Sequence, residues 1–125
     1  MVIIEKYREI IERILELLNT MEEGLEFIQI GLSELKYEEA QIVLKDVIDA
    51  VHSIDSSIQP MQSGLPQNNI STLSSLLKKS LDKALERFDQ NNELNINSLL
   101  ENETYPAFKS WREEIEKVLR PYILS

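Results

Sequence analysis

Apolar residues recur at alternating steps of four and three along the first 35 residues, which is the spacing of one face of an α-helix. This row comprises Ile3, Tyr7, Ile10, Ile14, Leu17, Met21, Gly24, Ile28, Gly31 and Leu35. A second row repeats every seven residues beside it and comprises Ile4, Ile11, Leu18, Leu25 and Leu32. An apolar face of this width can contact two neighbouring helices, so the pattern predicts a helix bundle.

The first helix is predicted over roughly residues 2–36. Asn19 and Thr20 offer a break point, because Thr20 with Glu23 fits a capping box and Gly24 lowers helix propensity. The apolar row keeps its phase through these residues, whereas a turn would normally reset the phase. We therefore favour a continuous long helix, with a break near Asn19 and Thr20 as the alternative.

Three further helices are predicted, over residues 37–59, 71–90 and 106–120. Pro60 ends the first of them, and residues 60–70 are typical of a connecting loop, which we expect to be the most mobile segment. Ser71 is a plausible N-cap for the next helix. The asparagine-rich residues 91–97 weaken helix formation and predict a short helix or a kinked lead-in to the last helix, which begins near Pro106.

These elements predict an all-α fold, an antiparallel up-and-down four-helix bundle with a long first helix. A chain of 125 residues can build one sizeable core, so residues 1–125 are expected to form a single domain.

The composition limits the classes of partner and the cellular location that we expect. A formal net charge of -9 repels phosphate backbones and anionic lipid surfaces, so neither nucleic acid nor a membrane is expected as a partner. The chain has no cysteine, which excludes disulfides and thiolate metal sites and favours a cytoplasmic location. Neither a signal peptide nor a membrane-spanning apolar segment is predicted.

The sequence carries no motif typical of an enzyme. A Gly-x-Ser-x-Gly elbow and a glycine-rich phosphate loop are both missing, and one histidine cannot supply the paired Glu-x-x-His motifs of a diiron bundle. We therefore expect no catalytic residue, no cofactor, no metal and no small-molecule substrate. His52 leaves one alternative, a histidine phosphotransfer bundle, although Asp55 and Ser56 stand where such domains carry a lysine and a glycine.

The start of the first helix is a candidate surface for a protein partner. If that helix is continuous, its first turns extend beyond the shorter helices and leave Ile4 and neighbouring apolar side chains partly uncovered. The candidate partner-binding residues are Ile3, Tyr7, Ile10, Ile11 and Ile14. The same face could pack against a second copy in a homodimer, which defines a self-associating module as a further alternative.

Three groups of residues together form a pattern that is similar to the pattern of a known protein family. The run Glu23-Gly24-Leu25-Glu26-Phe27-Ile28 places a glycine and an aliphatic residue before a Phe-aliphatic pair. Aliphatic residues follow at Val47, Ile48 and Ile54. The last group comprises Ala84, the Asn91-Asn92 pair, Phe108 and Trp111. In this order the residues resemble the pattern of the flagellin-specific export chaperones over roughly residues 20–115.

That resemblance implies a non-catalytic cytoplasmic four-helix bundle whose apolar grooves hold amphipathic helices of a client protein. We therefore interpret the chain as a helical binding protein, an export chaperone or adaptor.

Overall fold

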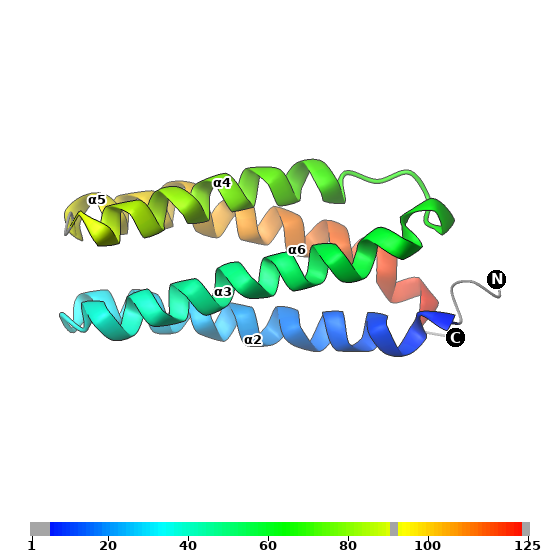
Figure 1. The fold of residues 1–125 in the computed structure, drawn as a ribbon, viewed down its shortest axis with the longest axis horizontal. Helices are drawn as coiled ribbons and strands as arrows, with labels where there is room; N and C mark the ends of the chain where they lie inside the picture. The colour runs from blue at the N-terminus through cyan, green and yellow to red at the C-terminus, as the bar shows by residue number, and fades with distance from the viewer. Residues whose placement is uncertain (1–5, 91–92, 124–125) are drawn as a thin grey trace.

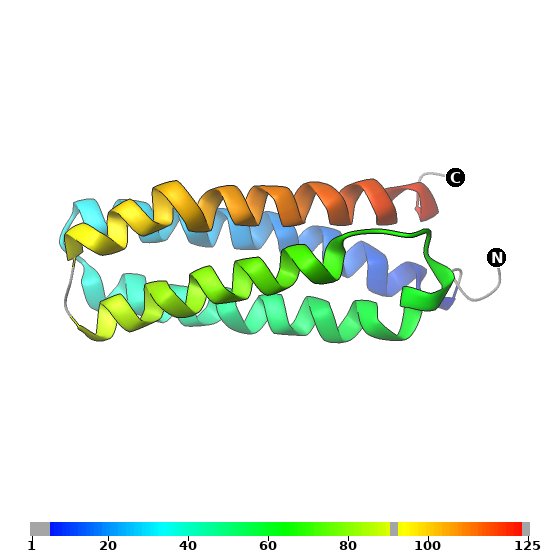
Figure 2. The same ribbon diagram turned by 90° about the horizontal axis from the view of Figure 1, so that it is seen from above.

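The computed structural model describes residues 6–90 and 93–123, and the described residues form an all-α, antiparallel four-helix bundle (Figures 1 and 2). Three long helices are α2 (Arg8–Ser33), α3 (Tyr37–Ile58) and α4 (Ile70–Asp89). The fourth is a helical run of α5 (Glu93–Leu99), the π-helix η2 (Leu100–Thr104) and α6 (Tyr105–Leu119). Short 3-10 turns follow α3 and α6, as η1 (Gln59–Gly64) and η3 (Arg120–Tyr122). The fourth run packs against both α4 and α2.

Helix α2 is continuous, as the unbroken apolar row predicts, and Asn19 and Thr20 lie inside it. The described members of the second row, Ile11, Leu18, Leu25 and Leu32, are all buried. Gly24 and Gly31 allow α3 to approach closely, because a Cβ built on Gly24 would lie 3.3 Å from Cγ2 of Val47.

The predicted end of the first helix is wrong by about one turn, because the chain leaves the helix after Ser33. The N–H of Lys36 donates to the Gly31 carbonyl at 2.7 Å, and the N–H of Leu35 donates to the Leu32 carbonyl at 3.3 Å. This is the Schellman pattern, and it places Leu35 at φ 62°. Leu35 therefore does not join the apolar face; it is 72% exposed in the α2–α3 turn.

The segment over residues 60–70 is not loop throughout, since η1 covers Gln59–Gly64 and buries Met61 in the core. Ser71 is not the N-cap of α4, because the helix begins one residue earlier at Ile70. Instead, Oδ1 of Asn68 accepts the N–H of Ile70 at 3.1 Å, and Oε2 of Glu114 accepts the N–H of Asn69 at 2.9 Å. A side chain from α6 thus helps to fix the start of α4.

The last helical run begins at Glu93, well before Pro106, while Asn91 and Asn92 lie outside the described residues. Proline lacks an N–H, and its ring crowds the carbonyl four residues earlier in an α-helix. The wider π turn ends two residues before Pro106, and it allows the helix to continue through the proline. A hydrogen bond of 2.6 Å between the buried hydroxyls of Ser80 and Thr104 ties this turn to α4.

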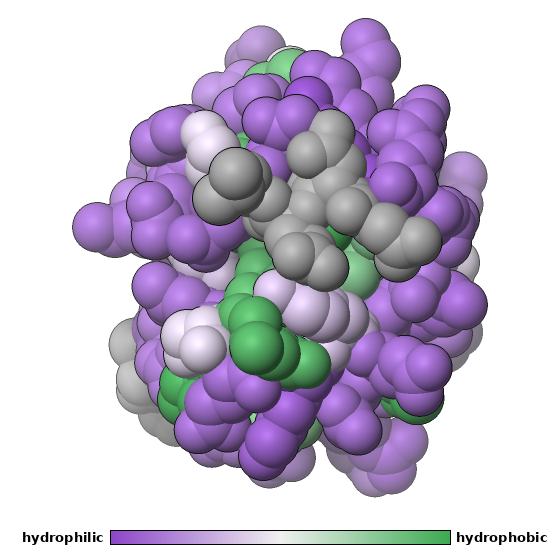
Figure 3. Space-filling model, turned by 90° about the vertical axis from the view of Figure 1, so that its left-hand side faces the viewer, coloured by the Kyte–Doolittle hydropathy of each residue, from purple (hydrophilic) through white to green (hydrophobic). Residues whose placement is uncertain are grey.

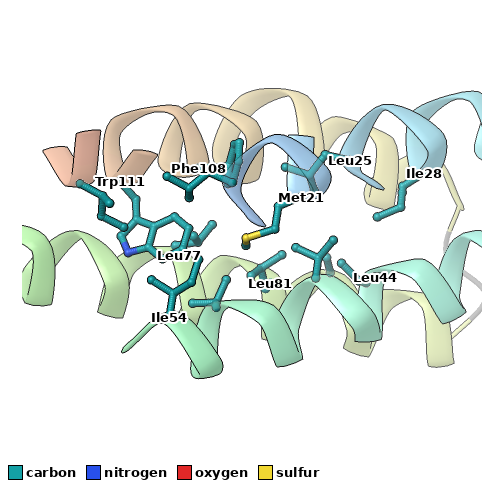
Figure 4. Packing of buried hydrophobic residues seen from close by; sticks show 14 of the residues in the cluster. Met21, Leu25, Ile28, Leu44, Ile54, Leu77, Leu81, Phe108 and Trp111 are labelled. Carbon is teal, nitrogen blue, oxygen red and sulfur yellow. The ribbon is translucent and has the colours of Figure 1, made fainter. Parts of the chain in front are cut away.

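Side chains from all four helical runs meet in one core (Figure 4). Met21 and Leu44 lie there with Leu81, and the Phe108 and Trp111 rings pack with their centroids 6.1 Å apart. Among the described helices, none is both long and apolar enough to cross a membrane.

Candidate functional site

The predicted partner surface at the start of α2 is largely buried within the bundle. Ile11 and Ile14 belong to the core, Tyr7 and Ile10 are half-buried against it, and Ile3 and Ile4 lie outside the described residues. The expectation that Ile11 is partly uncovered is therefore wrong, and Ile14 is only 3% exposed. The short turns η1 and η3 extend α3 and α6 at this end, and Met61 of η1 and Tyr122 of η3 pack with the core to which Ile11 and Ile14 belong. Arg8 Nη2 donates to the carbonyl of Ile123 at 3.2 Å across this end.

His52 is exposed on α3 and borders a cavity of about 380 Å³ between α3, η1 and α4. Lys78 is the only lysine or arginine among the described residues that line this cavity, and it forms an ion pair with Asp55. The buried hydroxyl of Ser74 donates to the same carboxylate, with both oxygens at 2.7 Å. The imidazole is accessible, but the cation beside it is already neutralised.

A groove runs along the seam between α2 and the fourth helical run, and it consists of two adjoining cavities of about 340 and 540 Å³. Gln29 lines both. The wall from α2 comprises Glu22, Leu25, Glu26, Gln29, Leu32 and Ser33. The opposite wall comprises Asn97, Ser98, Glu101, Asn102, Tyr105, Phe108, Lys109 and Arg112, and Tyr37 contributes at the turn. Because residues 22–33 rise by ~1.5 Å each, the groove is about 17 Å long.

Tyr105 joins the two walls near the middle of the groove. Its hydroxyl donates to the carbonyl of Leu25 at 3.2 Å. Burial first, and the nearby carboxylate of Glu101 second, raise the pKa of Tyr105 to about 12. The phenol therefore remains a hydrogen-bond donor at all physiological pH values.

Arg112 joins the walls at the end of the groove that lies away from the α2–α3 turn. Its Nε donates to Glu116 Oε1 at 2.6 Å on its own helix, and its Nη1 donates to Glu22 Oε2 at 2.8 Å on α2. The same guanidinium also donates to the side chain of Asn19 and to the carbonyl of Leu18. The hydrogen bond to Glu116 is the largest cause of the raised pKa of Arg112 and of the lowered pKa of Glu116.

The two cavities differ in their chemistry. The smaller one combines an apolar floor, Leu25 and Phe108, with two carboxylates and two cations. The larger one, at the end with the α2–α3 turn, is lined by amides, hydroxyls, Leu32 and the carboxylate of Glu101. Within the described residues, no group of three or more histidine or acidic side chains could hold a metal ion.

Apolar side chains also remain on the outer surface. Figure 3 faces the end of the bundle with the α2–α3 turn and shows a hydrophobic patch among hydrophilic residues. The large apolar residues exposed in the described chain are Phe27, Ile30, Leu35, Ile42 and Leu76. Surface of this kind is available for contact with another molecule.

Sequence reasoning did not identify this groove. In the sequence, Glu22 and Glu26 look like ordinary solvated positions on a helix, and Leu25 looks like a core position. The available signal was the seven-residue step between Tyr105 and Arg112, which places two long polar side chains on one face of the last helix. That signal does not reveal which helix faces them.

Comparison with protein families gives one match, to the family described as "Domain of unknown function (DUF8042)", over residues 9–114. No curated protein and no solved structure matches the chain.

Proposed function

The chain belongs to this family of unknown function, and we propose that it is a non-catalytic cytoplasmic binding protein that holds an amphipathic helix of a client protein, as an export chaperone or adaptor does. The groove between α2 and the fourth helical run is the observation that carries the proposal. Its length of about 17 Å corresponds to about three helical turns, enough for anchors at positions i, i+4 and i+7 of a bound helix.

The composition of the groove supports this use. Leu25 and Phe108 offer an apolar floor, while Glu26, Lys109 and the amide of Gln29 form a polar rim. Binding grooves for amphipathic helices combine these two properties, because the apolar face of the ligand is buried and its polar face stays at the edge. Leu25 and Glu26 also belong to the run that resembles the export chaperones.

The test fills the groove without touching the core. Gln29 is exposed and lines both cavities, so a Gln29→Trp substitution places an indole between the walls. Lys45→Trp adds the same side chain to the exposed surface of α3 and is the matched control. Tagged protein is used to capture partners from lysate of the source organism, and thermal unfolding checks that both variants fold.

We expect a stoichiometric protein partner that is lost with Gln29→Trp and retained with Lys45→Trp. A synthetic peptide from a helix of that partner should then compete for binding. Capture that is the same for both variants, or the absence of any partner, would contradict the proposal.

The accessibility of His52 favours one second candidate, phosphotransfer through that imidazole. Incubation with phosphoramidate, followed by mass spectrometry, measures transfer of a phosphoryl group to the ring. Labelling that disappears in His52→Gln would support this role, and unlabelled protein would remove it.

A further inference from the structure

The two ends of the groove differ in how their charges are balanced. At one end, Glu22 is paired with Arg112, and Glu26 shares the cavity with the cation of Lys109. At the other end, Glu101 is the only charged side chain among the described residues that line the larger cavity. Its neighbours there offer neutral amide and hydroxyl groups. The groove therefore carries one uncompensated negative charge at the end next to the α2–α3 turn.

Glu101 is held close to the groove by the helix that bears it. It lies in the π turn, four residues before Tyr105, whose hydroxyl bridges the two walls. The carboxylate of Glu101 adds to the raised pKa of Tyr105, of which burial is the larger cause. Within the described part of the chain, Glu101 has no ion-pair partner. Its carboxylate is exposed and available to a ligand.

We propose, on the basis of the function proposed above, that the client helix carries a lysine or arginine two turns from its central apolar anchor. The apolar residue covers Leu25 and Phe108, and the cation pairs with Glu101. Phe108 and Glu101 are seven positions apart, a distance of about 10 Å along a helix. A step of seven residues on the client covers the same distance and stays on the same helix face.

The charge of the whole protein agrees with such a partner. A net charge of -9 attracts a basic segment and repels a second copy of this chain. The client is therefore a cationic amphipathic helix of another protein.

The test uses two synthetic peptides of about 15 residues, with leucines at the spacing of one helix face. The first carries a lysine seven residues from its central leucine, and the second carries a glutamine there. Fluorescence anisotropy measures the Kd of each peptide for the full-length protein and for Glu101→Gln. Glu113→Gln, an exposed glutamate on α6 outside the groove, is the matched control for net charge.

We expect Glu101→Gln to weaken binding of the lysine peptide about three-fold, the scale of an exposed ion pair, and to leave the glutamine peptide unchanged. Glu113→Gln should weaken the lysine peptide less. Equal effects of the two substitutions would overturn the inference, because they would reflect net charge alone.

The same measurements separate this inference from the proposed function. Binding that Gln29→Trp abolishes but Glu101→Gln leaves intact keeps the groove as a helix-binding site and overturns the lysine pairing. Binding by no peptide at all, or binding that Gln29→Trp does not change, would overturn both.

Discussion

Leu35 is a position where glycine should make the protein more stable. It adopts φ 62°, in the left-handed region that costs a residue with a Cβ about 1.5 kcal/mol. Glycine removes this cost but gains freedom in the unfolded chain, which offsets about 0.5 kcal/mol. We therefore expect Leu35→Gly to be more stable than Leu35→Ala by about 1 kcal/mol.

The comparison with alanine isolates the backbone effect, because both substitutions remove the same side-chain contacts. These contacts are few, since Leu35 is 72% exposed, and their loss should cost about 0.5 kcal/mol. Leu35→Gly should then exceed the parent protein by about 0.5 kcal/mol, while Leu35→Ala should fall below it by a similar amount.

Urea unfolding followed by circular dichroism measures the three free energies. Glu23 provides the control, because it is exposed in the interior of α2, where glycine should be less stable than alanine by about 1 kcal/mol. A Leu35→Gly variant no more stable than Leu35→Ala would refute the assigned backbone strain.

Three further outcomes are expected. Ile14→Glu places a charge in the core and should lose more than about 4 kcal/mol of stability, whereas Ile10→Glu, at a half-buried position, should remain folded; circular dichroism and thermal unfolding distinguish the two. The lowered pKa of Glu116 contributes stability that is present above its unfolded-state pKa and is lost as the pH falls through its folded-state pKa, so Glu116→Gln should flatten the acid limb of a plot of unfolding free energy against pH. Tyr105→Phe leaves the carbonyl of Leu25 without this donor and should cost about 1 kcal/mol, measured by urea unfolding; an unchanged free energy would show that the bond contributes nothing.

The apolar rows predicted α2 well because burial along a helix follows its period directly. Ile11, Leu18 and Ile28 are completely buried, and the phase argument against a break at Asn19 was correct. The same rule failed at Leu35, because the chain leaves the helix before it reaches this apolar residue. Periodicity identifies the face of a helix, but the hydrogen bonds of its last turn decide where it ends.

The start of the fourth helical run was predicted only as a short helix or a kinked lead-in, and α5 is such a short helix, but local signals did not predict that it continues into the last helix. Asparagines and Pro106 disfavour helix, yet Ile96, Leu99 and Leu100 are buried in the core. Burial of those side chains outweighs the weak local preference, and the π turn accommodates the proline.

The candidate site was harder to predict than the fold, because it depends on which helices become neighbours. The contact of Lys78 with Asp55 joins α4 to α3, and the contact of Tyr105 with Leu25 joins α6 to α2. Periodicity shows that each helix has an apolar face, but it does not order the helices around the core. The groove residues therefore looked like ordinary solvated positions in the sequence.

The way in which the groove is held open determines which residues can be tested for binding. Tyr105 bonds to the backbone carbonyl of Leu25, and Arg112 bonds to the carbonyl of Leu18 and to the side chains of Glu22 and Asn19. The spacing of the walls therefore does not depend on the side chains of Gln29 or Glu101. Substitutions at Gln29 or Glu101 change the groove surface while these bridges remain. A loss of client binding in those variants therefore reports on recognition of the client. A loss of binding in a Tyr105 or Arg112 variant could come either from lost contacts with the client or from movement of the walls.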